Sequence, residues 1–181
     1  MFKAKFEDIN MNSQPLKATV AKKLRDGLTE TYPNCAEYIE SLWPSKAKVL
    51  SLKIKGESHY HFIKIDEEIA FIEIRDKPLI PVLRVLHKYP NMLAPMTCDK
   101  GAIKHIFSGS HVMAPGLTSE GGCITAGLEA GHPVAIMAEG KKHAMAVGFL
   151  QMSSADIQEK GKGEAIEVIH SLNDQVWKEI N

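Results

Sequence analysis

The side chains best suited to chemistry gather between residues 99 and 118, in the segment DKGAIKHIFSGSHVMAPGLT. Its serines and histidines suggest nucleophiles and bases, its lysines suit phosphate binding, and its glycines permit a close backbone approach. The candidate nucleophiles are Ser108, Ser110 and Cys123, and the candidate bases are His111 and His143. No nucleophile elbow, carboxylate pair or phosphate-cradling Lys-Ser/Thr motif organises these residues. We therefore expect a protein that binds rather than an enzyme, with no catalytic residue.

The cysteines and histidines lack the spacing of a metal site. Cys35, Cys98 and Cys123 are odd in number, which favours reduced thiols in a reducing compartment. His59 and His61 share one face of an expected strand, but no Cys, Asp or Glu supports them at a suitable spacing. We therefore predict neither a metal nor another cofactor.

Length and composition indicate a globular chain. Its 181 residues, 44% of them apolar, leave room for one large or two small domains. No apolar run approaches the ~20 residues of a membrane helix, and the first ten residues do not form a signal-peptide core. We expect a cytoplasmic protein that does not bind membranes.

The charge is balanced overall but unevenly distributed. Residues 1–92 carry 15 Lys and Arg against 12 Asp and Glu, and residues 93–181 carry 7 against 10, so the halves stand at +3 and −3. This balance argues against binding a polyanion by bulk charge alone. A nucleic-acid site in the second half must be a local basic patch drawn from Lys100, Lys104, Lys141, Lys142, Lys160 and Lys162.

Apolar spacing predicts three helices in the first half. Leu16 and the apolar residues that follow it every four positions indicate a helix capped by Ser13 and ending near Glu30. Asn34, with Glu37 three residues later, suggests a capping box for a second helix. The third helix is expected to open at Pro81 and to end at Pro90.

Between these helices the apolar period changes to two. Strands are expected from Val49 to Ile54, from His61 to Ile65 and from Ala70 to Ile74, with a hairpin loop at residues 66–68. This predicts three helices around a small antiparallel sheet. Asn91 to Met96 is the expected linker, and its apolar character suggests two domains packed together.

The second half is expected to combine a short helix with several strands. The helix starts near Asp99, Gly109 breaks it, an apolar strand runs from His111 to Ala114, and Pro115-Gly116 suits a type II turn with a positive φ at the glycine.

Two ordered blocks of the second half resemble a PUA domain, an RNA-binding pseudo-barrel. The first block is Asp-Lys-Gly-Ala-Ile-Lys, then Ser-Gly, then Val-Met-Ala-Pro-Gly. In the second block, Val134 to Met137 and Ala144 to Phe149 resemble the paired central strands of that domain, Met152 to Ser154 its short helix start, and Lys162 to His170 its last strand. The resemblance implies an α+β fold in which a small helix-plus-antiparallel-sheet domain precedes a C-terminal PUA pseudo-barrel. The positions that match its pattern are Lys100, Gly101, Ser108, Gly109, Pro115, Gly116, Leu117 and Thr118.

Further motifs extend the resemblance to nearly the full chain. Leu83 to Pro90 reads LRVLHKYP, the chain starts Met-Phe-Lys, Pro78 is present, and Leu-Asn-Asp precedes Trp177. Together they are similar to the malignant T-cell-amplified sequence family of translation factors. The resemblance implies an N-terminal α/β domain over 1–92 and a PUA domain over 93–181. It also implies pairing with a density-regulated-protein-like partner on the small ribosomal subunit, in tRNA release and recycling, reinitiation or non-standard placement of initiator tRNA.

We expect one groove to hold an RNA end such as the 3′ terminus of a tRNA. Aromatic residues are scarce in the second half, so lysines, backbone amides and shape should dominate recognition there. The expected lining adds Lys104 and the hairpin residues Lys141, Lys142 and His143 to the eight matching positions. Contacts to small-subunit RNA are expected at Lys22, Lys23, Arg25, Arg84 and Lys88.

One segment and one single residue depart from the family pattern. Two other functions also remain possible alternatives. Ser119 to Pro133 is not recognised in detail, and Val82 stands where the pattern favours a small polar residue. One alternative is an accessory protein or subunit in tRNA or rRNA modification or ribosome biogenesis. The other is a protein adaptor whose PUA domain no longer binds RNA.

Overall fold

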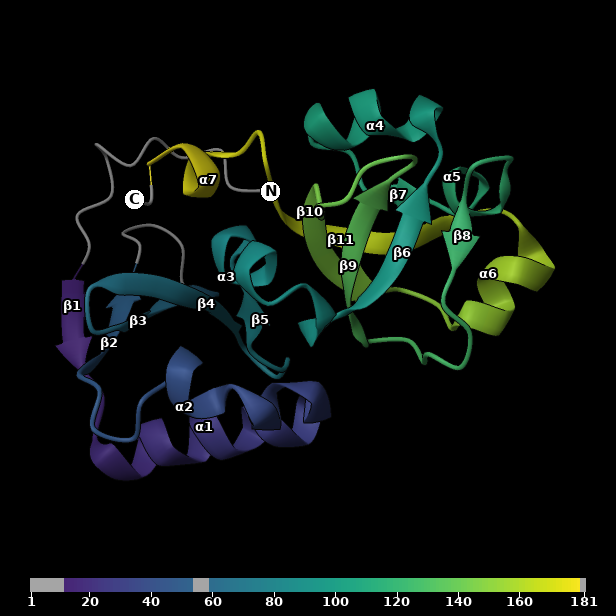
Figure 1. Cartoon of the computed structure of the whole chain (residues 1–181). Coiled ribbons are helices and arrows are strands. Elements are labelled where there is room, and N and C mark those ends of the chain that lie inside the picture. The colour runs from purple at the N-terminus through teal and green to yellow at the C-terminus, as the bar shows by residue number, and fades with distance from the viewer. Residues whose placement is uncertain (1–11, 54–58, 180–181) are drawn as a thin grey trace.

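The computed structural model describes residues 12–53 and 59–179, which form two β-sheets with their own helices (Figure 1). The first three residues and the expected strand end at Ile54 lie outside the described residues. Within these ranges, no helix is long and apolar enough to cross a membrane.

The first sheet is antiparallel throughout, with the strand order β1-β2-β3-β4-β5. The period-two prediction is confirmed, because the strands expected from Val49, His61 and Ala70 are all present. Phe62 and Ile72 are opposite each other and fully buried. The strands are β1 (Asn12–Pro15), β2 (Val49–Lys53), β3 (Tyr60–Ile65), β4 (Glu68–Ile74) and β5 (Ile80–Pro81).

Three expected helix starts in this half are wrong. Ser13 caps no helix, because Asn12–Pro15 pairs with β2 as an edge strand, where proline is tolerated. Asn34 lies inside a 3₁₀ turn, and its Nδ2 donates to Asn91 O at 3.1 Å rather than forming a capping box. Pro81 ends β5. The helices are α1 (Ala18–Thr31), the 3₁₀ turn η2 (Pro33–Glu37), α2 (Ile39–Leu42), α3 (Leu83–Lys88) and the 3₁₀ turn η3 (Pro90–Met92).

The second sheet curls into a half-barrel with the strand order β7-β11-β10-β9-β6-β8 (Figure 1). The expected strands at 134–137 and 144–149 are confirmed as an antiparallel pair, although the second begins at Ala146. The expected linker at 91–96 is wrong in its C-terminal part, because that part pairs in parallel with β9. The strands are β6 (Ala94–Cys98), β7 (Val112–Met113), β8 (Cys123–Ile124), β9 (Pro133–Ala138), β10 (Ala146–Leu150) and β11 (Glu164–Ser171).

Side-chain caps fix two of the helices in this half where the sequence predicts them. Asp99 Oδ1 accepts from Ala102 N at 2.8 Å, and Ser153 Oγ accepts from Asp156 N at 3.1 Å. The type II turn expected at Pro115-Gly116 is absent, because these residues open a short helix instead. The helices are α4 (Lys100–Phe107), α5 (Pro115–Thr118), α6 (Ser154–Lys160) and α7 (Gln175–Glu179).

The two halves share one apolar core. Ala135, Val147, Phe149 and Ile169 of the second sheet are buried in the same cluster as the first half. Lys77 Nζ also contacts Glu167 Oε2 at 2.6 Å across the junction. The second cluster lies inside the half-barrel. The halves are therefore packed against each other, as the apolar segment between them indicates.

Gly109 provides a test of the α4-to-β7 connection. Its φ is 94°, a conformation that a β-branched residue rarely adopts, and its N–H donates to Ile106 O at 3.0 Å. Gly109→Val should therefore destabilise the protein by about 1–3 kcal/mol, measured by urea unfolding. A Gly109→Val protein as stable as the parent would show that this turn can adopt another backbone conformation without loss of stability.

Candidate nucleic-acid interface

A groove of about 660 Å³ lies between α4, β7 and α5. The side chain most unusual in it is Met113, an apolar residue that is 50% exposed. Its walls combine the polar face of α4 with the turn after Gly109 and one acidic residue from β11. The groove is lined by Asp99, Gly101, Ala102, Lys104, His105, Ile106, Ser110, His111, Val112, Met113, Gly116 and Glu164.

Backbone contacts between its walls hold the groove in shape. Asp99 N donates to Gly116 O at 2.9 Å, and Ser110 N donates to His105 O at 3.0 Å. A Cβ on Gly116 would lie 3.0 Å from the Ala102 Cβ. Glycine at position 116 therefore serves a close approach of α5 to α4, rather than the positive φ that the sequence suggested.

The candidate base of this region has a structural role. His111 Nδ1 accepts from Val168 N at 3.0 Å, which fixes the imidazole on β11. Ser108 Oγ donates to Lys104 O at 2.8 Å within α4. Each side chain is thus committed to backbone contacts, and neither hydrogen bond prepares a nucleophile.

The groove is not a basic patch, because its lining holds one lysine against two carboxylates. Lys104 is exposed on its α4 wall, whereas Lys100 Nζ lies 3.5 Å from Glu139 Oε1 and its backbone N donates to Glu139 Oε2 at 3.3 Å. Asp99 and Glu164 are the acidic members of the lining. Such a groove suits a single strand held by shape, an apolar contact and few phosphate contacts, rather than a long polyanion.

The structure brings together only part of the predicted site. Gly101, Lys104 and Gly116 line the groove. The other predicted residues of this region are not in the lining and have structural roles. Gly109 turns the chain after α4, and Ser108 is the C-cap of that helix. Pro115 opens α5, Leu117 is buried, and Thr118 Oγ1 donates to Ala114 O.

The hairpin Lys141-Lys142-His143 does not join this lining. It connects β9 to β10 with all three residues exposed, and the His143 ring lies 5.2 Å from the His87 ring of α3. The expectation of one groove containing both glycine turns and this hairpin is therefore not met. Antiparallel pairing carries the hairpin toward the junction of the two halves.

Sequence reasoning missed Met113, His105 and Ser110 as groove-lining residues. Met113 belongs to an apolar segment that reads as a buried strand, but β7 is only two residues long and lies at the edge of its sheet. The available signal is the helical period of α4, which places His105 on the same face as Gly101, four positions earlier. That period does not indicate which neighbouring segment lies across the groove.

Of the cations expected to contact the ribosome, Lys22 and Lys23 are exposed on α1. Lys22 Nζ pairs with Asp26 at 2.6 Å. Arg25 is largely used inside the fold, because its Nε donates to Trp43 O at 2.8 Å and its guanidinium pairs with Glu40. Arg84 and Lys88 are exposed on α3, next to the junction.

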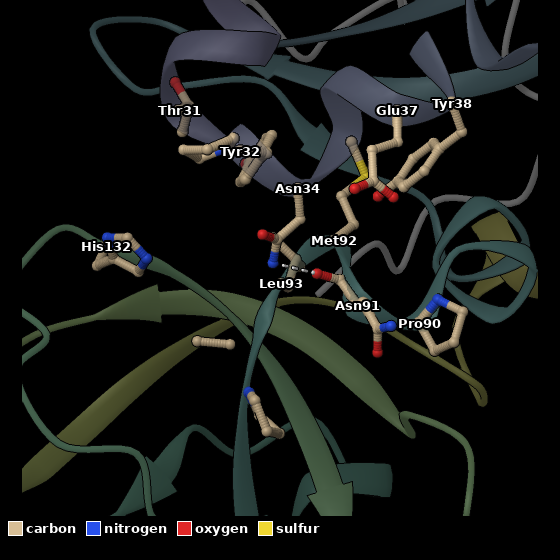
Figure 2. A pocket seen from close by; sticks show the side chains of 13 residues that line it. Thr31, Tyr32, Asn34, Glu37, Tyr38, Pro90, Asn91, Met92, Leu93 and His132 are labelled. Atoms are coloured by element: carbon tan, nitrogen blue, oxygen red, sulfur yellow. Dashed lines mark hydrogen bonds between the residues drawn. The ribbon is translucent and has the colours of Figure 1, made fainter.

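A second cleft, of about 730 Å³, opens between the halves and is shown in Figure 2. Asn34 and Asn91 line the cleft and are joined by a hydrogen bond from Asn34 Nδ2 to Asn91 O, and His132 lines it from the second half (Figure 2). Burial lowers the pKa of His132. None of the described residues that line this cleft is Lys or Arg, so its chemistry does not suit phosphates.

The described residues contain no group of three or more His, Cys, Asp or Glu side chains arranged to hold a metal ion. His61 Nδ1 lies 3.4 Å from Glu73 Oε2, which is one pair rather than a ligand set. The three cysteines are free thiols, with Cys35 and Cys98 buried and Cys123 exposed.

Alkylation should distinguish these thiols. Burial, with a smaller contribution from the Asp99 charge, raises the pKa of Cys98 to about 12, and burial also raises the pKa of Cys35. A raised pKa keeps a thiol in its unreactive neutral form at pH 8. In the folded protein, iodoacetamide should therefore label Cys123 quickly and the other two only after denaturation, as peptide mass spectrometry can show. Rapid labelling of Cys98 would contradict its burial.

Family models match both halves of the chain. A Pre-PUA-like domain matches residues 3–90, and a model described as "elF2D, PUA domain" matches residues 93–175. A Drosophila melanogaster relative, Malignant T-cell-amplified sequence 1 homolog, is 42% identical over 180 residues, which cover 98% of this chain and 97% of the relative. The chain belongs to the malignant T-cell-amplified sequence family. A mouse member, Malignant T-cell-amplified sequence 2, is 41% identical over 167 residues, covering 92% of this chain and 90% of that protein.

The family also includes a more distant relative and shares its fold with archaeal proteins. Translation machinery-associated protein 20 of Schizosaccharomyces pombe is 36% identical over 174 residues, covering 96% of this chain and 94% of that protein. A hypothetical protein of Pyrococcus horikoshii superposes with a TM-score of 0.74 at 23% identity, covering 94% of this chain and all of that one. A PUA domain protein of Aeropyrum pernix superposes with a TM-score of 0.67 at 22% sequence identity, covering 93% of this chain and 90% of that one. These likenesses confirm the predicted α+β fold with its PUA pseudo-barrel.

Proposed function

We propose that this protein is a non-enzymatic, RNA-binding translation factor. The observation that carries the proposal is the match of nearly the whole chain to a family that includes a translation machinery-associated protein, together with a PUA domain. The groove beneath α4 supports it, because a shaped cleft with Lys104 and exposed Met113 suits a single-stranded RNA end.

The finer assignment concerns the ribosome. We propose that the protein acts in the cytoplasm on the small ribosomal subunit, together with a density-regulated-protein-like partner. Its step would be tRNA release and recycling, reinitiation or non-standard placement of initiator tRNA. Residues 1–92 and 93–181 would be its two domains, and the α4 groove would receive the 3′ end of a tRNA.

The contacts of one candidate nucleophile, Ser108, and one candidate base, His111, favour a binding protein over an enzyme. Each is committed to a backbone group. A catalytic nucleophile instead needs an adjacent base and access to substrate.

Co-sedimentation tests this function. The tagged full-length protein should migrate with free small ribosomal subunits in a gradient and should capture a density-regulated-protein-like partner from a cell lysate. Absence of both associations would contradict a role in translation. A modified nucleotide that appears on tRNA only in the presence of the protein would point to an enzyme.

A further inference from the structure

Three segments far apart in the sequence meet at the junction of the two halves. They are α3, the hairpin loop of residues 140–145 between β9 and β10, and α7, and we call them together the junction face. Figure 1 shows α3 between the two sheets with α7 nearby. Sequence reasoning assigned the hairpin and α3 to two different sites.

The first contact of the junction face joins α7 to α3. The Arg84 guanidinium carbon lies 4.7 Å from the centre of the Trp177 ring, and Arg84 Nη2 donates to Trp177 O at 3.2 Å. The His87 ring approaches Trp177 edge-on, with the ring centres 5.5 Å apart. Two α3 side chains therefore hold the helix that carries exposed Lys178.

The second contact joins the hairpin to the same helix. His87 Nε2 donates to Ala144 O at 2.8 Å, and the His87 and His143 rings lie 5.2 Å apart. His87 thus touches both α7 and the hairpin. Through this one residue, the exposed side chains Lys141 and Lys142 are brought beside the cations of α3.

The charge of the junction face is predominantly positive. Lys88, Lys141, Lys142 and Lys178 are exposed there, in addition to Arg84. The last residue of α7, Glu179, is the one acidic residue in the three segments as the structure describes them. The acidic residue nearest in sequence to the hairpin, Glu139, is paired with Lys100.

The distribution of lysines makes this face unusual for its half of the chain. Residues 93–181 carry a net charge of −3 with seven Lys and Arg, and Lys141, Lys142 and Lys178 are three of those seven. The groove beneath α4, by contrast, has Lys104 balanced by two acidic lining residues. The junction face is therefore the better place for several phosphate contacts.

The aromatic residue of the face indicates what kind of RNA it suits. Trp177 has Arg84 stacked on its ring and His87 at its edge, so it is not available to stack on an unpaired base. Because Trp177 is occupied and the exposed side chains of the face are mainly cationic, recognition depends chiefly on charge and shape. Those are the features by which proteins recognise an A-form helix, whose backbone phosphates are regularly spaced.

We propose that the junction face binds the phosphate backbone of double-helical RNA, as a site separate from the groove beneath α4. The inference rests on the proposed RNA-binding function and adds to it a second, sequence-independent contact made jointly by both halves. A single RNA molecule could then place a single-stranded end in the groove and a helical part on the junction face.

Paired charge reversals test the proposal. One variant carries Lys141→Glu with Lys142→Glu, and a second carries Lys88→Glu with Lys178→Glu. The control carries Lys46→Glu with Lys48→Glu, which makes the same charge change at exposed positions outside the three segments of this face. All six lysines are exposed, so circular dichroism and thermal unfolding should show folded proteins.

The probes are an RNA duplex of about 20 base pairs and a single strand of equal length. Each junction-face variant should bind the duplex roughly tenfold more weakly than the parent, with a slope of log K against log salt smaller by about 0.9 per lost contact. The control should keep the parental affinity and slope.

The outcomes separate the two proposals. A parent that binds neither RNA nor small subunits would contradict the proposed function itself. A parent that binds RNA, with junction-face variants no weaker on the duplex than the control, would overturn this inference alone. Weaker binding only to the single strand would likewise overturn it, by assigning the face to unpaired RNA.

Discussion

Gly148→Ala should destabilise the protein by roughly 3–5 kcal/mol, because a core position without free space has no room for a methyl group. Gly148 lies in β10, where a Cβ would come within 2.2 Å of Glu167 O and 2.9 Å of Ile166 Cγ2 on β11. A backbone oxygen cannot rotate away as a side chain does. The two strands would have to separate at the register shift between Val147 and Gly148. The free energy of unfolding in urea measures the loss.

The matched control for this change is Gly27→Ala. Gly27 lies in α1, and a Cβ there meets nothing within 4 Å. Alanine is the better helix former, so this variant should gain about 0.5–1 kcal/mol. If both variants were equally stable, the tight approach of β10 to β11 would not be a feature of the folded protein.

Asp174→Ala should be the second strongly destabilising change, at about 3 kcal/mol or more. The Asp174 side chain is 0% exposed and that of His170 is 1% exposed. Asp174 Oδ2 accepts from His170 Nδ1 at 2.8 Å and from Ser171 N at 3.0 Å, and Oδ1 accepts from Trp177 N at 2.9 Å. Removing the carboxylate leaves all three of these donors without their acceptor.

The change should also release α7, and Trp177 reports this directly. Trp177 fluorescence should shift to longer wavelength as the ring leaves Arg84 and His87, while buried Trp43 keeps its environment. The control is Asp156→Ala, where a side chain that is 40% exposed pairs with Lys160 at the surface. Such a solvent-exposed pair should contribute little to the free energy of unfolding. An Asp174→Ala protein with parental stability and fluorescence would show that α7 is held by other contacts.

Local signals succeeded where a residue and its sequence neighbours were sufficient. The period-two pattern located β2, β3 and β4, because buried and exposed side chains alternate along each single strand of a half-buried sheet. Asp99 and Ser153 marked the starts of α4 and α6, because a cap bonds to an amide only two or three residues away. Gly109 marked the end of α4 for the same reason.

Local signals failed where the partner was distant. Asn12–Pro15 became a strand because β2 offers it an edge, although Ser13 and Pro15 suit a helix start. Gly116 supports a close contact with Ala102 rather than a turn. Asn34 bonds to Asn91 of η3, 57 positions along the chain, rather than to its own helix.

The sequence by itself determined the fold class, the family resemblance and the cationic residues available to hold RNA. Only the tertiary structure decided which of those cations share a surface. His87 of α3 touches both Ala144 and Trp177, so Lys141 and Lys142 belong with α3 rather than with the α4 groove. The physical reason is that the spacing of residues within one element fixes its buried face. The neighbours of an exposed lysine depend instead on how two separately formed sheets pack together.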